Sequence, residues 1–168
     1  MRKRTPDEIR AFVREHKVQI LPKKASWLMR ACAWFLYWTW INRDFMDRYT
    51  TTVGKKIYYR ESWGDFDINS DTHVRRHAST LEHEFVHVLQ YKKWWLLYQF
   101  TYLLVFLPLG LAWFRFYWER EAYQVNRLYG RNIESCVDAL WSYGWPWPRS
   151  RMRKWFENHP VEDTALAA

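Results

Sequence analysis

Hydrophobic residues near the start of the chain recur with the period of a helix. They form one stripe, made of Ile9, Phe12, Val13 and Val18. A helix start signal precedes the stripe, with a capping residue, a proline in the first turn and an acid three residues after the cap, at Thr5, Pro6 and Glu8. This pattern predicts a helix from residue 6 to about residue 20, ended by Pro22.

The pattern changes to that of strands between residues 49 and 60. Two short runs rich in β-branched and aromatic residues, 49–53 and 56–59, flank Gly54. We expect a hairpin or a pair of bent strands here. The next stretch, 61–72, is dense in glycine, aspartate and asparagine, which predicts a loop.

The other hydrophobic segments predict helices. Residues 25–41 are apolar and aromatic, as is typical of a buried or interfacial helix, and further helices are expected over 77–93, 116–129 and 133–141. Residues 145–168 contain a basic run and predict a partly loose tail. These patterns together predict a single domain of the α+β class, mostly helical, with a small hairpin beside one of the helices.

Composition and charge narrow the classes of partner. Aromatic residues make up 20% of the 168 residues, including 13 tryptophans, and the formal net charge is +8. So much aromatic surface must be packed, bound to a partner or placed at a lipid interface, and the positive charge favours anionic partners. No nucleic-acid motif accompanies the charge, so nucleic acid is not the expected partner. Cys32 and Cys136 stand in no metal-binding spacing, and no signal-peptide pattern follows the basic N-terminus, so we expect a cytoplasmic protein.

The segment His83-Glu84-Phe85-Val86-His87 carries the chemistry of the chain. Two histidines four residues apart on a helix lie on one face and can bind a single Zn²⁺ ion. Glu84 is turned partly off that face, where its carboxylate can accept a proton from a metal-bound water. Such a site also needs a third protein ligand and an open position for water.

The third ligand must come from another element. Glu119 and Glu121 stand two residues apart on one predicted helix, so they point to nearly opposite faces and only one of them can reach the metal. The other candidates are His73, His77 and His159.

Three segments, 51–59, 81–91 and 119–123, resemble the small bacterial HExxH metallopeptidase-like domains of the gluzincin type. The resemblance covers roughly residues 49–129, which we take as the catalytic core. It implies a zinc-dependent peptidase in which a glutamate on a helix after the HExxH helix is the third ligand.

In several of those families this glutamate stands three residues before a small residue, and Glu119 with Ala122 fits that pattern. The resemblance therefore implies Glu119 as the ligand that joins His83 and His87, with Glu121 as the alternative. Related families often have an aspartate after the small residue that supports a zinc histidine. Tyr123 stands there in this chain, which leaves the support of the histidines open.

The resemblance also implies a strand that aligns an extended peptide substrate by edge pairing, and residues 55–59 are expected to do so. A tyrosine or a histidine usually stabilises the tetrahedral intermediate in such enzymes. The candidates for that role are Tyr58, Tyr59, Tyr123 and His77.

Residues 94–114 contain no charged side chain and are long enough for one membrane crossing. A single crossing would put His87 and Glu119 on opposite sides of the bilayer, where they could not share a zinc ion. We therefore expect an apolar helical hairpin. It either packs on the core or lies in a membrane interface through the aromatic residues between Trp94 and Trp118.

Three hypotheses follow from the sequence. The first is a zinc metallopeptidase that hydrolyses a peptide bond with Glu84 as the base. The second is a non-catalytic domain on the same scaffold that binds zinc, a membrane or a partner. The third is a small membrane protein in which residues 94–114 span the bilayer and the HExxH match is a coincidence.

Overall fold

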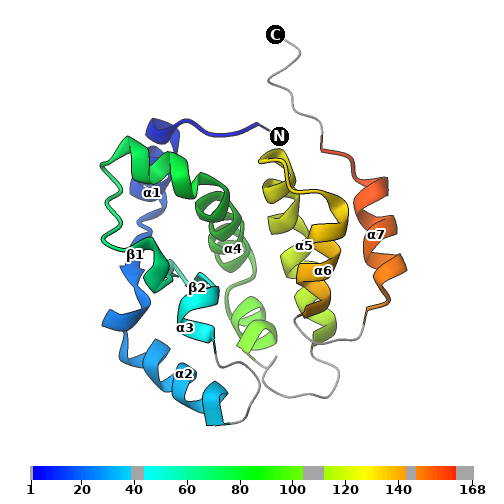
Figure 1. Cartoon of the computed structure of the whole chain (residues 1–168), viewed down its shortest axis with the longest axis horizontal. Coiled ribbons are helices and arrows are strands. Elements are labelled where there is room, and N and C mark those ends of the chain that lie inside the picture. Colours follow the sequence, from blue (N-terminus) through cyan, green and yellow to red (C-terminus); the bar gives the residue numbers. More distant parts are fainter. Residues whose placement is uncertain (1, 39–43, 104–111, 143–146, 162–168) are drawn as a thin grey trace.

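The computed structural model describes residues 2–38, 44–103, 112–142 and 147–161, and shows a mostly helical protein with one small sheet (Figure 1). The predicted α+β class is confirmed. The elements are, in order, α1 (Pro6–His16), β1 (Gln19–Pro22), the 3-10 helix η1 (Lys23–Ala25), α2 (Trp27–Trp38), α3 (Phe45–Arg48), β2 (Thr51–Val53), β3 (Lys56–Tyr59), the 3-10 helix η2 (Glu61–Trp63), α4 (Asp71–Leu103), α5 (Ala112–Leu128), α6 (Ile133–Ser142) and α7 (Arg149–Asn158).

Helix α1 begins where the sequence predicted and ends earlier. The Thr5 hydroxyl accepts a hydrogen bond from the Glu8 amide at 3.3 Å, and the Glu8 carboxylate accepts one from the Thr5 amide at 2.8 Å, which completes a capping box. The helix stops at His16 because Lys17 adopts a left-handed conformation, with φ of 51°. The predicted end near residue 20 was therefore wrong, and the chain continues as a strand.

The sheet has three strands in the order β1-β3-β2. The expected hairpin of β2 and β3 is confirmed as an antiparallel pair, and β1, which was not predicted, pairs parallel with β3. The central position of β3 means that both of its edges are occupied by other strands. The expectation that residues 55–59 would pair with a substrate was therefore wrong, because no edge of that strand is available.

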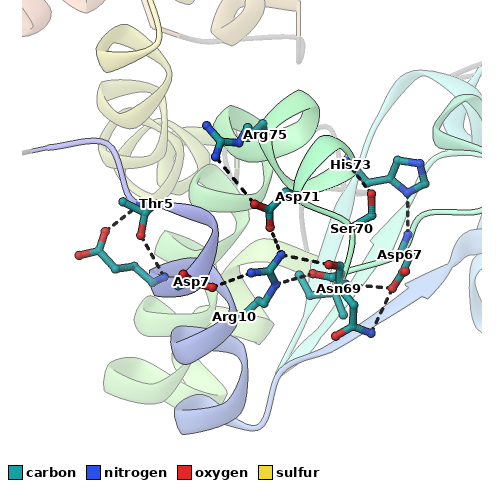
Figure 2. Close-up of polar contacts among 11 residues, drawn as sticks. Thr5, Asp7, Arg10, Asp67, Asn69, Ser70, Asp71, His73 and Arg75 are labelled. Atoms are coloured by element: carbon teal, nitrogen blue, oxygen red, sulfur yellow. Dashed lines mark hydrogen bonds and ion pairs between the residues drawn. The ribbon is translucent and has the colours of Figure 1, made fainter.

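Helix α4 carries the HExxH segment and begins at Asp71, six residues before the predicted start. Figure 2 shows how Arg10 of α1 organises the loop that leads into it. The Arg10 guanidinium donates to the carbonyl oxygens of Ile68 and Asn69 at 3.0 and 3.1 Å, and it also pairs with Asp71. These contacts join the first turn of α4 to α1, so the helix that carries the HExxH segment begins at a restrained position.

Helix α4 is interrupted at Trp95, whose φ of 35° and ψ of −107° lie outside the helical region. The backbone then continues as a helix to Leu103, and α5 starts at Ala112. The middle of the predicted apolar hairpin, residues 104–111, lies outside the described residues. Within the described part of the chain, no helix is both long enough and apolar enough to cross a membrane.

Two clusters of buried side chains form the core. The first packs α1 and the sheet against α4 and includes Ile9, Phe12, Ile57, Leu81 and Phe85. Phe12 and Phe85 stack with ring centres 4.2 Å apart. The second packs α5, α6 and α7 together and is centred on Tyr123, Cys136, Val137, Trp147 and Phe156.

The predicted helices over 116–129 and 133–141 are confirmed as α5 and α6. Helix α7 was not predicted, because the basic run after residue 148 suggested solvated chain. Met152 and Phe156 stand four residues apart in α7, and both are buried in the second cluster.

Candidate metal centre

Helices α4 and α5 bring three donor groups together between the two core clusters. His83 and His87 lie on successive turns of α4, and Glu119 reaches them from α5. The Oε2 atom of Glu119 lies 3.3 Å from Nε2 of His83 and 3.5 Å from Nε2 of His87. Exposure falls from 12% at the His83 side chain to 2% at both His87 and Glu119. Of the three side chains, His83 is therefore the one that is partly exposed, whereas His87 and Glu119 are almost fully buried.

The two nitrogen-to-oxygen separations are compatible with a tetrahedral zinc site. Zinc bonds to nitrogen and oxygen of about 2.0–2.1 Å imply that two ligand atoms of a tetrahedron lie about 3.3 Å apart. Both nitrogen-to-oxygen distances are close to that value and longer than the usual 2.7–2.9 Å or so of a charge-assisted hydrogen bond. Two imidazoles and one carboxylate are also the ligand set of many catalytic zinc sites.

The electrostatics of the group favour a positive charge within it. Burial of the His87 ring opposes protonation, yet the carboxylate of Glu119 outweighs burial and raises the pKa of His87 to about 9. The His87 ring beside this buried carboxylate thus favours its protonated form when no cation is bound. A metal ion would take the place of that proton.

Asn126 determines which nitrogen of His83 faces Glu119. The Asn126 amide nitrogen donates to the Ser79 carbonyl oxygen at 3.1 Å and to the Ser79 hydroxyl at 2.9 Å. Its amide oxygen therefore faces Nδ1 of His83, at 2.8 Å, and can only accept. Nδ1 must carry the hydrogen in the neutral ring, which leaves the lone pair of Nε2 directed at the metal position.

Gln90 does the same for His87. The Gln90 amide nitrogen donates to the Trp118 carbonyl oxygen and to the carboxylate of Glu121, both at 2.9 Å. Its amide oxygen lies 3.0 Å from Nδ1 of His87, which must then be the donor. Glu121 is exposed, and its carboxylate accepts the hydrogen bond from Gln90. The structure therefore brings Glu119, and not Glu121, to the two histidines.

Glu84 lies beside the group and is held by the sheet. Its carboxylate is 5% exposed, and Oε2 accepts a hydrogen bond of 2.6 Å from the hydroxyl of Thr52 in β2. Thr52 is itself buried, opposite Ile57 of β3. The hairpin and the HExxH helix are thus neighbours, as predicted, and the contact between them restrains the carboxylate of the expected base.

The structure places the other candidate ligands elsewhere. Nδ1 of His73 accepts a hydrogen bond of 3.1 Å from the Asp67 amide, as Figure 2 shows. His77 stacks on Trp63 with ring centres 4.0 Å apart. His159 stacks on Trp155 after the end of α7. Each of these rings serves local packing and does not join the cluster of donor atoms.

The four candidates for stabilising a tetrahedral intermediate lie in different parts of the structure. Tyr59 and His77 both stack on Trp63 in the first core cluster. Burial lowers the pKa of His77 to about 4, so it is neutral at physiological pH. Tyr58 alternates with Ile57 and faces the side of the sheet away from α4. Tyr123 is the candidate that meets a proposed ligand, with its ring edge-on to His83 at 5.0 Å.

Sequence reasoning missed the two amides and one aromatic ring at the site. Gln90 stands three residues after His87, and Asn126 stands seven after Glu119, so both share a helix face with a donor. That spacing was the available signal. Tyr98 is 1% exposed and stacks near His87, with ring centres 6.2 Å apart.

Comparisons of the chain with family models, with curated proteins and with solved structures find no match. Function is therefore inferred from the chemistry of the residues themselves.

Proposed function

We propose that this chain is a zinc-dependent metallopeptidase that hydrolyses a peptide bond. The observation that supports the proposal is the convergence of His83, His87 and Glu119, with a restrained carboxylate at Glu84 beside them. A purely structural zinc site has four protein ligands and no use for such a carboxylate. Three protein donors and an adjacent base are the parts that a hydrolytic site requires.

Each of these residues has a separate role in the proposed hydrolysis. His83, His87 and Glu119 would hold the zinc ion, which when bound acidifies water and polarises the substrate carbonyl. Glu84 takes a proton from the attacking water as the new carbon–oxygen bond forms, and then delivers it to the amine nitrogen as the carbon–nitrogen bond breaks. The Thr52 hydroxyl bonds Oε2 of Glu84, which restrains the carboxylate that accepts the proton.

The sheet also suggests where a peptide would lie. Strand β2 stands at the end of the sheet and contacts Glu84 through Thr52, so it is the edge strand closest to the proposed base. An extended peptide would pair with the outer edge of β2, and not with β3.

Metal analysis combined with a peptidase assay tests the proposal. Wild-type protein is expected to bind about one zinc ion per chain and to cleave members of a peptide library. Glu84→Gln should keep the metal and lose turnover, whereas Glu119→Gln should lose the metal.

Glu15→Gln is the matched control, because it makes the same chemical change at a glutamate of α1 that is 76% exposed, and it should keep both metal and turnover. A chain that takes up no zinc would overturn the proposal. Equal turnover by Glu84→Gln and wild type would instead favour a non-catalytic domain.

A further inference from the structure

Exposed tryptophans are concentrated at one end of the molecule. Of the twelve large hydrophobic side chains exposed in the described residues, nine belong to α2 or to residues 94–97 of α4. These two segments lie at the lower end of the molecule in Figure 1. We define the tryptophan surface as Trp27, Trp34 and Trp38 of α2 with Trp94 and Trp95 of α4, which are 73%, 66%, 64%, 45% and 60% exposed.

The three tryptophans of α2 form a stripe along the helix. They are spaced seven and four residues apart, which places them on one face. Met29 and Leu36 are buried, with exposures of 2% and 4%, and they attach the helix to the body of the protein. The tryptophans are therefore not core residues that happen to reach the surface, because the helix already has a separate buried side.

Positive charge accompanies this surface. Helix α2 contains no acidic residue, and its one charged side chain, Arg30, is exposed. Lys92 and Lys93 are exposed just before the α4 tryptophans, and the Lys93 ammonium lies 5.5 Å from the centre of the Trp94 ring. Lys24 is exposed just before α2. The surface thus combines indole rings with cations, on a chain whose net charge is +8.

We propose that the tryptophan surface binds the face of an anionic lipid bilayer, with α2 lying in the headgroup region. Indole rings favour that region because they are apolar and carry one hydrogen-bond donor, and neighbouring lysines and arginines attract anionic headgroups. Helix α2 has 12 residues, whereas a membrane crossing needs about 20, so it lies along the surface and does not cross.

A lipid surface fits these residues better than a second copy of the chain. Lysine is depleted at the centres of protein interfaces, whereas lysine beside tryptophan is common where proteins meet lipid headgroups. Two copies meeting through this face would also bring Lys92 and Lys93 of each chain toward like charges. Trp118 of α5 is only partly exposed and lies edge-on to both Tyr98 and Trp94. We therefore assign the membrane face to α2 and the tryptophans of α4, and take Trp118 as its inner boundary.

Vesicle sedimentation tests the proposal with the full chain. Wild-type protein should sediment with vesicles of phosphatidylcholine and phosphatidylglycerol, and bind vesicles of phosphatidylcholine alone more weakly. The triple variant Trp27→Ser, Trp34→Ser, Trp38→Ser should lose vesicle affinity by at least about tenfold. Trp141→Ser is the matched control, because Trp141 is 49% exposed but lies on α6.

A second variant tests the proposal separately, so that the result does not depend on whether the triple variant folds. Lys92→Glu with Lys93→Glu should weaken binding to the anionic vesicles and leave binding to phosphatidylcholine unchanged. The proposal fails if wild type binds neither kind of vesicle, or if the triple variant binds as well as wild type. It also fails if light scattering shows that the wild-type protein is a dimer, that the triple variant is a monomer, and that the wild-type protein binds no vesicles.

Vesicle binding does not depend on the proposed peptidase. Glu84→Gln and zinc-free protein should sediment with vesicles as wild type does, so the two proposals can fail separately.

Discussion

Asn126 and Gln90 orient the two histidines by amide groups whose own direction is determined by backbone carbonyl oxygens. An amide flipped by 180° would leave its nitrogen facing a ring nitrogen that must donate, and would leave a carbonyl oxygen without its donor. The arrangement therefore selects one tautomer at each ring. Support of this kind usually changes metal affinity by about 10- to 100-fold when it is removed.

Replacing Asn126 tests this support directly. Asn126→Leu should weaken zinc binding by about 10- to 100-fold, because the His83 ring loses its acceptor and the Nε2 lone pair loses its orientation. Competition with a chromophoric chelator measures the change. Gln124→Leu is the control, since Gln124 is an amide on the same helix that bonds to the His159 carbonyl oxygen away from the donors. Equal affinities of the two variants would contradict the role given to Asn126.

The candidate metal ligands and the base could be predicted from the sequence, whereas the amides that orient the two histidines could not. His83, Glu84 and His87 follow a pattern whose spacing has a chemical reason, and Glu119 was preferred over Glu121 through the resemblance to gluzincins. Gln90 and Asn126 are single amides on otherwise ordinary helices. Their role depends on where Ser79 and Trp118 present carbonyl oxygens, and only the packing of α4 against α5 determines that.

Among the elements, β2 contributes a single side chain to the site and positions the proposed base with it. Thr52 has 2% exposure and donates its hydroxyl hydrogen to Glu84 from the sheet. The hairpin was predictable from its local pattern. Strand β1 was not, because it pairs with β3 across more than 30 residues of chain and its four residues continue an apolar pattern that began in α1.

Thr52→Val removes the hydroxyl and keeps the shape of the side chain. Turnover should fall by about tenfold, because Glu84 loses one charge-assisted hydrogen bond, while zinc content stays the same. Steady-state kinetics and metal analysis measure the two quantities. Thr51→Val makes the same chemical change one residue earlier, on the other face of the strand, and should leave turnover at the wild-type value.

Over the whole molecule, the donor atoms connect the two core clusters. His83 and His87 belong to the helix that packs on α1 and the sheet, and Glu119 belongs to the helix that packs on α6 and α7. An ion bound between them would join the two halves of the core, at donor atoms that only the folded chain brings together. Metal binding is then part of the free energy of folding.

Zinc should therefore raise the melting temperature of the wild-type protein. At free zinc about 100 times the dissociation constant, the added stability is about 2.7 kcal/mol. Thermal melts with zinc and with a chelator measure the difference. Glu119→Gln should show no response to zinc, and a melt of wild type that is unchanged by zinc would show that the ion does not bind the folded chain.

We expect the buried Lys23 side chain to make the stability of the molecule depend on pH. Its side chain is 0% exposed and its ammonium donates to the Phe45 carbonyl oxygen at 2.6 Å. Burial lowers the pKa of Lys23 to about 7, although the carboxylates of Glu84 and Asp47 raise it. The unfolded chain therefore binds more protons than the folded chain between about pH 7 and pH 10.5, the ordinary pKa of a lysine side chain, and the free energy of unfolding rises with pH in that window.

Urea unfolding at pH 7 and pH 9 measures this effect. The free energy of unfolding of wild type relative to Lys23→Met should increase by roughly 2 kcal/mol between the two pH values. Lys24→Met is the control, because Lys24 is exposed, and its difference from wild type should not change with pH. A constant difference between Lys23→Met and wild type would show that the buried ammonium has an ordinary pKa.

The two amides also extend the sequence pattern by which a site of this kind can be recognised. The spacing on α4 reads His-Glu-x-x-His-x-x-Gln, and that on α5 reads Glu-x-x-x-x-x-x-Asn. One residue inserted within either pattern would rotate the amide by about 100° around its helix and remove it from its histidine. A chain that carries both patterns on two helices packed as α4 packs on α5 should therefore be able to build the same centre, even where the rest of its sequence has diverged.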